Sequence, residues 1–316
     1  MPKVSVILPN YNHAKFLDER LISILQQSFQ DFELIILDDS STDNSLEVLN
    51  NYFFDTRIRF YPNDKNSGNT FMQWSKGIAL AKGEYIWIAE SDDVAHKDFL
   101  AKTVEVLDKS PNTVLVFTRS ELIDENGNGL GIFKHSQKEL NKLCQEGFYL
   151  DGTQAIRAYF LRSNIIPNAS SVLLRKSALP QLGKELFSFK LAGDWFFYTQ
   201  LAVKGEIGFL SDRLNFFRVH SATVRNSTQK TSLGILEHIK IIRFARGQIK
   251  LSCSDIFGAF SALFSRFGFV SHRLSLLDNA QVFAAIFKLN PAISIISSVY
   301  FLKGFVAYYK TEQEKN

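Results

Sequence analysis

The sequence predicts an open, mostly parallel α/β sheet flanked by helices and followed by a helical C-terminal region. Two observations lead to this prediction. In residues 1–117, short apolar segments alternate with segments of helical spacing roughly every 25 residues, as in parallel sheets covered on both faces. From Thr231 onward only helical spacing is found, and Phe and basic residues become frequent.

The expected strands are short and apolar, and each ends at a polar or glycine-containing turn. They cover residues 4–8, 32–37, 58–61, 85–89, 113–117, 169–174 and 214–219. A hairpin is expected around Asn126-Gly127, because this dipeptide separates two apolar segments. The expected helices cover residues 16–27, 46–49, 71–81, 98–108, 153–161, 194–203, 233–249, 256–267, 274–287 and 292–309. Residues 134–147 are polar and are expected to form a loop.

Composition excludes several classes of protein. The chain has 316 residues with 36 Lys and Arg against 32 Asp and Glu, a charge of +4 that does not indicate nucleic-acid binding. Cys144 and Cys253 are 109 positions apart (253 − 144) without a CxxC motif, which predicts free thiols in a reducing cytoplasm and no zinc site. The chain enters a strand directly, so no signal peptide is expected, and no apolar segment is long enough to predict a membrane span.

Three acids, Glu90, Asp92 and Asp93, directly follow the strand expected at 85–89. Neighbouring carboxylates raise one another's pKa and destabilise a fold unless a cation lies between them. Mg²⁺ prefers such oxygen ligands, usually together with substrate phosphates. The cluster therefore predicts either a metal-diphosphate site or a solvated loop that caps the helix beginning near Lys97.

Two further polar clusters, at residues 9–12 and 38–43, also follow expected strands. Ligands of open α/β sheets bind outside the carboxyl ends of the strands, so three converging clusters favour the active-site interpretation. No GxGxxG follows the first strand and no GxxxxGK[ST] occurs, which removes the main support for a dinucleotide or P-loop site. A phosphate-binding site without such a loop needs a metal or basic side chains.

Five segments follow one another in the first hundred residues: VSVILPNYN at 4–12, DDSSTD at 38–43, NSG at 66–68, KGI at 76–78 with AKGEYI at 81–86, and ESDD at 90–93. In this order they resemble the inverting nucleotide-sugar glycosyltransferases of family 2, which have the A-type glycosyltransferase fold. The resemblance covers about residues 1–225. It implies an α/β domain with a Rossmann-like sheet and a site for a nucleoside-diphosphate sugar.

The resemblance also implies roles for individual residues. Pro9 and Tyr11 would line the pocket for the base, and Asp39 would accept a hydrogen bond from it. Glu90 and Asp92 would stand in for the family's Asp-x-Asp motif, with Asp92 binding the Mn²⁺ or Mg²⁺ ion that carries the diphosphate. The residues expected to bind the donor are Pro9, Tyr11, Asp38, Asp39, Asn66, Glu90 and Ser91.

The chain departs from the family pattern at two places. Glu90 is one methylene longer than the usual Asp, although it can still reach the ribose or a metal-bound water. Trp74-Ser75 stands where the family often has Arg-Asn, so a cation for the diphosphate is missing there. Arg218 or Arg225 is a candidate replacement, and Trp74 is expected to pack within its helix because indole is costly to expose.

Asp194 is the predicted catalytic base. In the family the base comes from a Glu-Asp or Gly-Asp pair that opens a helix about a hundred residues after the metal motif; Gly193-Asp194 lies 102 positions after Asp92 (194 − 92). A half-buried carboxylate has a raised pKa that suits a base. The alternative is that Asp194 only caps this helix. His220 fits the family's Tyr/Phe-Arg-x-His element, whose His approaches the metal or diphosphate, although a lone His is often structural.

The predicted domains are a catalytic domain at 1–225 and a helical region at 226–316. The first divides into a nucleotide-sugar-binding half at 1–117 and an acceptor half at 118–225. The helical region predicts either a subdomain with its own core or a basic, aromatic surface in peripheral contact with the inner membrane leaflet.

The sequence as a whole predicts a metal-dependent, inverting glycosyltransferase of cell-surface polysaccharide biosynthesis. It would be cytoplasmic, with peripheral contact at the membrane. The donor would be a nucleoside-diphosphate sugar, with UDP favoured, and the acceptor a hydroxyl of a glycan or lipid-linked glycan. The alternatives are a sugar nucleotidyltransferase, which usually needs a glycine- and Arg/Lys-rich loop after the first strand, and a non-catalytic glycan-binding protein.

Overall fold

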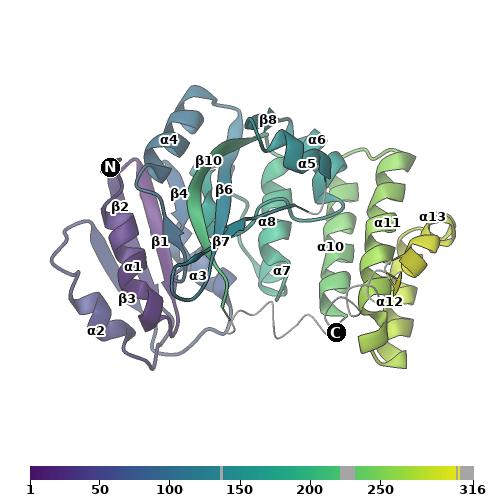
Figure 1. The fold of residues 1–316 in the computed structure, drawn as a ribbon, viewed down its shortest axis with the longest axis horizontal. Coiled ribbons are helices and arrows are strands. Elements are labelled where there is room, and N and C mark those ends of the chain that lie inside the picture. Colours follow the sequence, from purple (N-terminus) through teal and green to yellow (C-terminus); the bar gives the residue numbers. More distant parts are fainter. Residues whose placement is uncertain (136–137, 221–231, 304, 307–316) are drawn as a thin grey trace. The chain divides into compact units, whose positions relative to one another are not determined.

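The computed structural model describes residues 1–135, 138–220, 232–303 and 305–306 (Figure 1). They cluster into two compact units. The first contains Met1–Gly152, Ile166–Ser188 and Lys204–His220. The second contains Thr153–Ile165, Phe189–Val203 and the described residues from 232 onward. The domain boundary expected at residue 225 lies outside the described residues and stays a prediction.

One mixed sheet runs through the first unit in the order β3-β2-β1-β4-β9-β6-β10-β5, with β7 paired to β6 and β8 to β10. Its strands are β1 Val4–Asn10, β2 Phe32–Asp38, β3 Ile58–Pro62, β4 Tyr85–Ile88, β5 Val94–Ala95, β6 Thr113–Ile123, β7 Gly129–Ile132, β8 Phe148–Leu150, β9 Val172–Arg175 and β10 Glu206–Arg218.

The strand directions confirm the predicted sheet. β3, β2, β1 and β4 are parallel neighbours, β10 is parallel to β6, and β9 runs antiparallel between β4 and β6. Asn10 and Asp38, the last residues of β1 and β2, are register partners. The segments that follow β1, β2 and β4 therefore leave the sheet at one edge, as the polar clusters predicted.

Helices cover this sheet and its edges (Figure 1). In the first unit they are α1 Ala14–Leu25, α2 Ser45–Asn50, α3 Thr70–Leu80, α4 Phe99–Lys109, α5 Lys138–Leu143, α7 Lys184–Phe187 and the 3₁₀ turns η2 Ala169–Ser171 and η3 Lys176–Ala178. α3 lies very close to β1, because a Cβ added at Gly77 would meet Ile7 Cγ2 at 2.4 Å. A Cβ at Gly83 would meet the Ser5 backbone nitrogen at 2.5 Å, so both glycines are needed for close packing.

Two expectations for the first unit were wrong. Residues 134–147 contain α5, whose Leu140 is buried together with Cys144 four positions later; this short apolar pair on one helical face was hidden among polar residues. β10 begins at Glu206, well before the expected residue 214. The pairing of β10 with β6 is irregular near Leu210 and Arg213. This irregularity breaks the alternation of apolar and polar residues that would have indicated the first half of β10.

The second unit is helical, and its C-terminal part contains the helices that the sequence predicted. Its elements are α6 Gly152–Ala155, which begins at the end of the first unit, the π-helical η1 Ile156–Phe160, α8 Gly193–Ala202, α10 Leu233–Gln248, α11 Cys253–Val270, η4 Ser271–Arg273, α12 Leu276–Leu289 and α13 Pro291–Ser297. Residues 299–303 and 305–306 are also helical.

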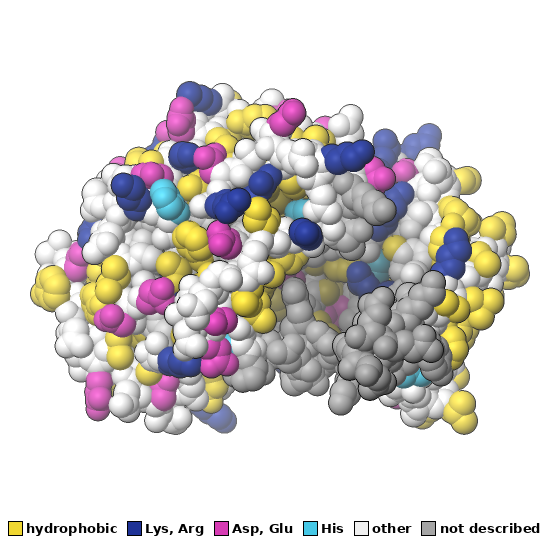
Figure 2. Space-filling view, in the orientation of Figure 1, with side chains coloured by type: hydrophobic (Ala, Val, Ile, Leu, Met, Phe, Trp, Pro, Cys, Tyr) yellow, Lys and Arg dark blue, Asp and Glu magenta, His cyan; other side chains and the backbone are white. Residues whose placement is uncertain are grey.

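Phe and aliphatic side chains form a core within the C-terminal helices. Phe260, Phe264 and Phe267 of α11 are fully buried, as are Val282 and Ile286 of α12. Other apolar side chains remain on the surface: Figure 2 shows hydrophobic side chains gathered over α12 and α13 at the right-hand edge of the view. The exposed large apolar side chains after α11 include Leu276, Leu277, Ile295, Ile296, Val299, Leu302 and Val306. Within the described residues, no helix combines the length and apolar character that a membrane span requires.

Candidate metal and donor site

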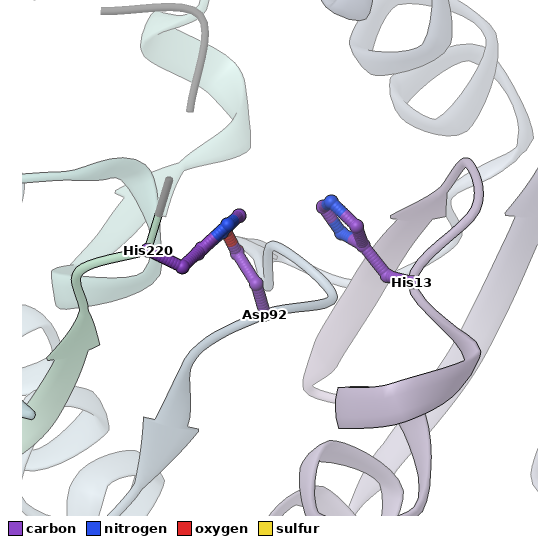
Figure 3. A group of neighbouring side chains, drawn as sticks. All are labelled: His13, Asp92 and His220. Atoms are coloured by element: carbon purple, nitrogen blue, oxygen red, sulfur yellow. The ribbon is translucent and has the colours of Figure 1, made fainter. Parts of the chain in front are cut away.

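Three side chains meet at the carboxyl edge of the sheet: His13 after β1, Asp92 after β4 and His220 after β10 (Figure 3). His220 Nε2 lies 2.9 Å from Asp92 Oδ2. One potential ligand atom from each residue lies within 4.8 Å of the other two. Imidazole nitrogens and carboxylate oxygens are common ligands of divalent metals, so the residues present fit the ion that the sequence predicts. The predicted pair Asp92 and His220 is thus brought together.

Sequence reasoning missed His13. The turn after β1 positions it: Asn12 adopts a left-handed conformation with φ 56°, which Asn tolerates better than most residues. Asn12 Oδ1 accepts a hydrogen bond from the Thr42 backbone N–H at 2.7 Å, which ties the turn to the loop after β2. His13 Nδ1 lies 2.7 Å from the buried Ser91 hydroxyl. The sequence did contain one indication of this role, because His13 directly follows the turn at the end of the first strand.

Charge interactions stabilise this trio. Burial alone would raise the pKa of Asp92, but the hydrogen bond from His220 and the nearby imidazoles lower it overall. The same hydrogen bond raises the pKa of His220 despite its burial. Burial lowers the pKa of His13, which favours its neutral, metal-binding form.

The other two acids of the cluster have different partners. Glu90 Oε1 accepts a hydrogen bond from Trp74 Nε1 at 3.0 Å, and burial together with the Asp92 charge raises the pKa of Glu90 to about 8. Asp93 accepts hydrogen bonds from Asn168 Nδ2 and the Arg218 backbone N–H. Burial and the neighbouring Asp92 also raise its pKa. Asp93 thus holds the loop after β4 in place.

Two buried arginines lie near the acids. Arg218 donates to the Asp92 carbonyl at 2.8 Å, to the Asp124 carbonyl at 2.9 Å and to Glu19. It is therefore a structural support rather than the cation that the sequence suggested, and Arg225 lies outside the described residues. Arg20 is fully buried against Trp87, and none of its guanidinium nitrogens has a hydrogen-bond partner among the described residues. Burial lowers the pKa of Arg20 to about 10, so it remains charged at neutral pH near the acid cluster.

The two acids after β2 organise the neighbouring loops. Asp38 Oδ1 accepts from Asn10 Nδ2 at 2.8 Å and from the Ser41 hydroxyl at 2.6 Å. Asp39 Oδ1 accepts from Asn63 Nδ2 at 2.7 Å, and both its oxygens accept from Ser67. Gln73 Nε2 also donates to Asp39 Oδ1, at 2.8 Å. Any contact of Asp39 with a base would therefore add to an existing network.

The remaining predicted donor residues line the same edge. Pro9 is buried in β1, whereas Tyr11 is 46% exposed and can cover a ligand. Asn66 Oδ1 accepts a hydrogen bond from the Gly68 backbone N–H at 2.6 Å, which shapes the loop after β3. Ser91 contacts His13, as described above.

Asp194 belongs to the second unit and is the second residue of α8. The N-cap of this helix is Ala192, so Asp194 is not the cap that the alternative required. Its Oδ2 accepts a hydrogen bond from Asn164 Nδ2 at 3.0 Å, and its Oδ1 accepts from the Trp195 backbone N–H at 2.7 Å. The carboxylate is half-buried, as expected for a base.

Glu237 of α10 holds the loop that leads to Asp194, a role that sequence patterns did not indicate. It is fully buried and accepts hydrogen bonds from the backbone N–H groups of Lys190 at 2.7 Å, Leu191 at 3.0 Å and Ala192 at 2.8 Å. A carboxylate inside an amphipathic helix normally lies in solvent. Its three acceptor contacts explain the exception.

Comparisons with known proteins agree with this architecture. TarS 1-349 from S. aureus in complex with UDP-GlcNAc superposes with a TM-score of 0.72 at 18% identity, covering 99% of this chain and 92% of that one. The mannosyltransferase PcManGT from Pyrobaculum calidifontis, in complex with GDP-Man and Mn²⁺, gives a TM-score of 0.57 at 15% identity, with 98% and 87% covered. At these identities the likeness establishes the A-type glycosyltransferase fold.

Sequence relatives include enzymes of cell-wall polymers. A putative teichuronic acid biosynthesis glycosyltransferase, TuaG of Bacillus subtilis, is 34% identical over 140 residues, which are 44% of this chain and 55% of TuaG. The poly(ribitol-phosphate) β-N-acetylglucosaminyltransferase TarS of Staphylococcus aureus is 30% identical over 171 residues, 52% of this chain and 29% of TarS. The matches thus span about half or less of these relatives.

A family model covers the segment that carries His13, Asp92 and the donor-side loops. The model described as glycosyl transferase family 2 matches residues 5–165, about half of the chain. The chain therefore belongs to glycosyl transferase family 2.

Proposed function

We propose that this glycosyltransferase moves a sugar from a nucleoside-diphosphate donor to a hydroxyl of a glycan or lipid-linked glycan, with inversion and with help from a divalent metal. The observation that carries the proposal is the convergence of His13, Asp92 and His220 at the sheet edge. A UDP-sugar is favoured because the TarS structure holds UDP-GlcNAc. Relatives acting on teichuronic acid and poly(ribitol-phosphate) support a role in cell-surface polymer synthesis. The family assignment supports transfer over nucleotidyl transfer or binding alone.

In this mechanism Asp194 removes the proton from the acceptor hydroxyl while the oxygen of that hydroxyl attacks C1 of the sugar. Asn164 and the Trp195 N–H orient the Asp194 carboxylate for that task. One displacement inverts the anomeric centre, so no enzyme nucleophile is needed. Asp92, His220 and His13 would hold the metal, which supplies positive charge to the departing diphosphate. Pro9, Tyr11 and Asp39 would bind the base, with Asp38, Asn66, Glu90 and Ser91 completing the donor site.

We also propose that the protein works at the inner face of a membrane. The support is the exposed apolar set on α12, α13 and residues 299–303 and 305–306, together with Lys288 and Lys303. Apolar side chains beside cations suit the interface of an anionic leaflet.

The function is tested by incubating UDP-, GDP- and dTDP-sugars with the protein and Mn²⁺, and then with a chelator. We expect metal-dependent release of UDP from at least one UDP-sugar, accelerated by the true acceptor. Asp194→Asn should lower turnover by ~10²–10⁴-fold while retaining UDP affinity, because only the general base is lost. Exposed Asp31→Asn is the matched control. Wild-type turnover in Asp194→Asn would contradict the base, and no turnover of any donor would contradict the function.

A further inference from the structure

We infer that His13 is a metal ligand beside Asp92 and His220, and that Glu90 is not a ligand. This inference rests on the proposed metal dependence and refines it. The resemblance placed the family's Asp-x-Asp motif on Glu90 and Asp92. The structure instead brings in a residue from the turn after β1.

The spacing of the three side chains fits one ion. Metal–ligand bonds of about 2.1 Å place adjacent ligand atoms about 3 Å apart and opposite ones about 4 Å apart. The 2.9 Å between His220 Nε2 and Asp92 Oδ2 matches the adjacent spacing. All three ligand atoms lie within 4.8 Å of one another, so a small movement of the side chains would bring them to the spacing that one ion requires. In Figure 3 the three side chains extend from separate segments toward a shared space.

His13 is oriented in the way a ligand is. One ring nitrogen, Nδ1, contacts the Ser91 hydroxyl, which is buried and fixes the ring. The ring also packs edge-on against Phe16 and His220, with centroids 6.1 and 5.8 Å away. Metal-binding histidines commonly have one nitrogen hydrogen-bonded to the protein while the other binds the metal.

Glu90 is directed to a different partner. Its Oε1 accepts the indole N–H of Trp74, which is 2% exposed and fixed in α3. Glu90 is absent from the group of converging ligand atoms, the single such group among the described residues. Because Glu is longer than Asp, the Glu90 carboxylate reaches the indole N–H of Trp74. This hydrogen bond holds the carboxylate away from the three converging side chains.

The resulting donor set has consequences for metal choice. Two imidazole nitrogens and one carboxylate favour transition ions, whereas Mg²⁺ prefers oxygen ligands. Removing His13 should therefore weaken Mn²⁺ or Co²⁺ binding much more than Mg²⁺ binding. A role of His13 in packing alone would not discriminate between these ions.

The experiment is calorimetric titration of the full chain with Mn²⁺ and with Mg²⁺, each with saturating UDP. His13→Gln should lower the affinity for Mn²⁺ at least ~10-fold, because even the loss of a residue that only supports a ligand costs that much metal affinity. The affinity for Mg²⁺ should fall less. Glu90→Gln keeps an oxygen for Trp74 and should change Mn²⁺ affinity less than threefold. His135→Gln, which removes a half-buried imidazole outside the group, should change neither affinity. Electron spin-echo spectra of bound Mn²⁺ should show imidazole nitrogen coupling that weakens in His13→Gln.

The outcomes separate the inference from the function. If Glu90→Gln loses Mn²⁺ affinity while His13→Gln retains it, the ligand assignment is overturned. If His13→Gln has wild-type affinity and an unchanged nitrogen signal, His13 is not a ligand, although metal-dependent transfer still stands. If wild-type protein transfers sugar but binds neither ion, the inference fails together with the metal part of the proposed function. Metal-free melting curves of each variant confirm that it is folded.

Discussion

Trp74 and Glu90 form a pair in which each residue explains the other. An indole in α3 is buried by packing against Phe71, yet its N–H still needs an acceptor. The Glu90 carboxylate reaches it at 3.0 Å. A shorter Asp at position 90 would leave the indole donor farther from a carboxylate. The two departures from the family pattern are therefore one local change, and it reshapes the acid cluster around Asp92.

His238 is a second residue whose surroundings predict a measurable effect. It is fully buried in α10, its Nε2 contacts the Leu161 carbonyl at 3.0 Å, and its ring packs on Trp195 with centroids 4.5 Å apart. Burial, and secondarily the Arg266 charge, lower the pKa of His238 well below its usual value. In the folded protein this imidazole is neutral.

The pH dependence of stability follows from that shift. Above the unfolded pKa of about 6.5, both states hold His238 neutral and it has no effect. As pH falls below that value, only the unfolded state gains the proton, so the free energy of unfolding decreases. Between pH 7 and pH 5 the loss should be about 2 kcal/mol. Urea unfolding at pH 7 and at pH 5 measures this loss. Between these pH values the free energy of unfolding of His238→Gln should fall by about 2 kcal/mol less than that of the wild type. Other histidines, such as His13 and His135, titrate in both proteins, so their effects cancel in the comparison. Parallel curves of unfolding free energy against pH would show that His238 does not cause the loss of stability.

At the scale of elements, the long regular segments were predictable and the irregular ones were not. β1, β2 and β4 are almost entirely buried and mostly apolar, a composition that indicates a parallel sheet. β5 has two residues and β8 three, too few for any periodicity. Asp92 and Asp194 follow recognisable motifs, whereas His13 and Glu237 depend on contacts between distant segments. Such contacts leave no local pattern in a sequence.

The contact between α10 and α8 predicts the effect of removing Glu237. Glu237→Ala leaves three backbone N–H groups before α8 without their acceptor. The free energy of unfolding should fall by about 3 kcal/mol, given 1–3 kcal/mol for each buried group left unsatisfied and partial access of water. Because Asp194 lies in the first turn of α8, turnover should also fall, while the KM for the donor changes little. Thermal melts and steady-state kinetics measure both effects.

Exposed Glu47→Ala of α2 is the control, and Glu237→Gln should give an intermediate loss because it keeps one acceptor oxygen. A donor KM that rises in proportion to the fall in turnover would show that the loop does not act through Asp194.

For the molecule as a whole, the C-terminal helices have both a buried core and an exposed apolar surface. Their Phe residues build a core, which explains the aromatic content without a membrane. Their remaining apolar side chains are on the surface: Leu276 is 91% exposed and Leu277 69%. Composition predicted helices after the α/β sheet, and the described C-terminal residues are helical. The burial of individual Phe and Leu side chains could not be predicted, because a helix rich in apolar residues on all sides has no single predictable face.

This surface leads to a binding prediction at the scale of the whole chain. The protein should co-sediment with vesicles rich in phosphatidylglycerol and less with phosphatidylcholine alone. Leu276→Ser combined with Leu277→Ser should weaken binding to both kinds of vesicle at least ~10-fold, since each buried Leu contributes about 1.5–3 kcal/mol. Lys303→Gln should weaken binding only to the anionic vesicles, by roughly fivefold for about 1 kcal/mol per cation. Leu130→Ser in β7, where Leu130 is 58% exposed, is the matched control. If the double variant bound vesicles like wild type but lost a concentration-dependent dimer in sedimentation velocity, the surface would bind a second copy instead of a membrane.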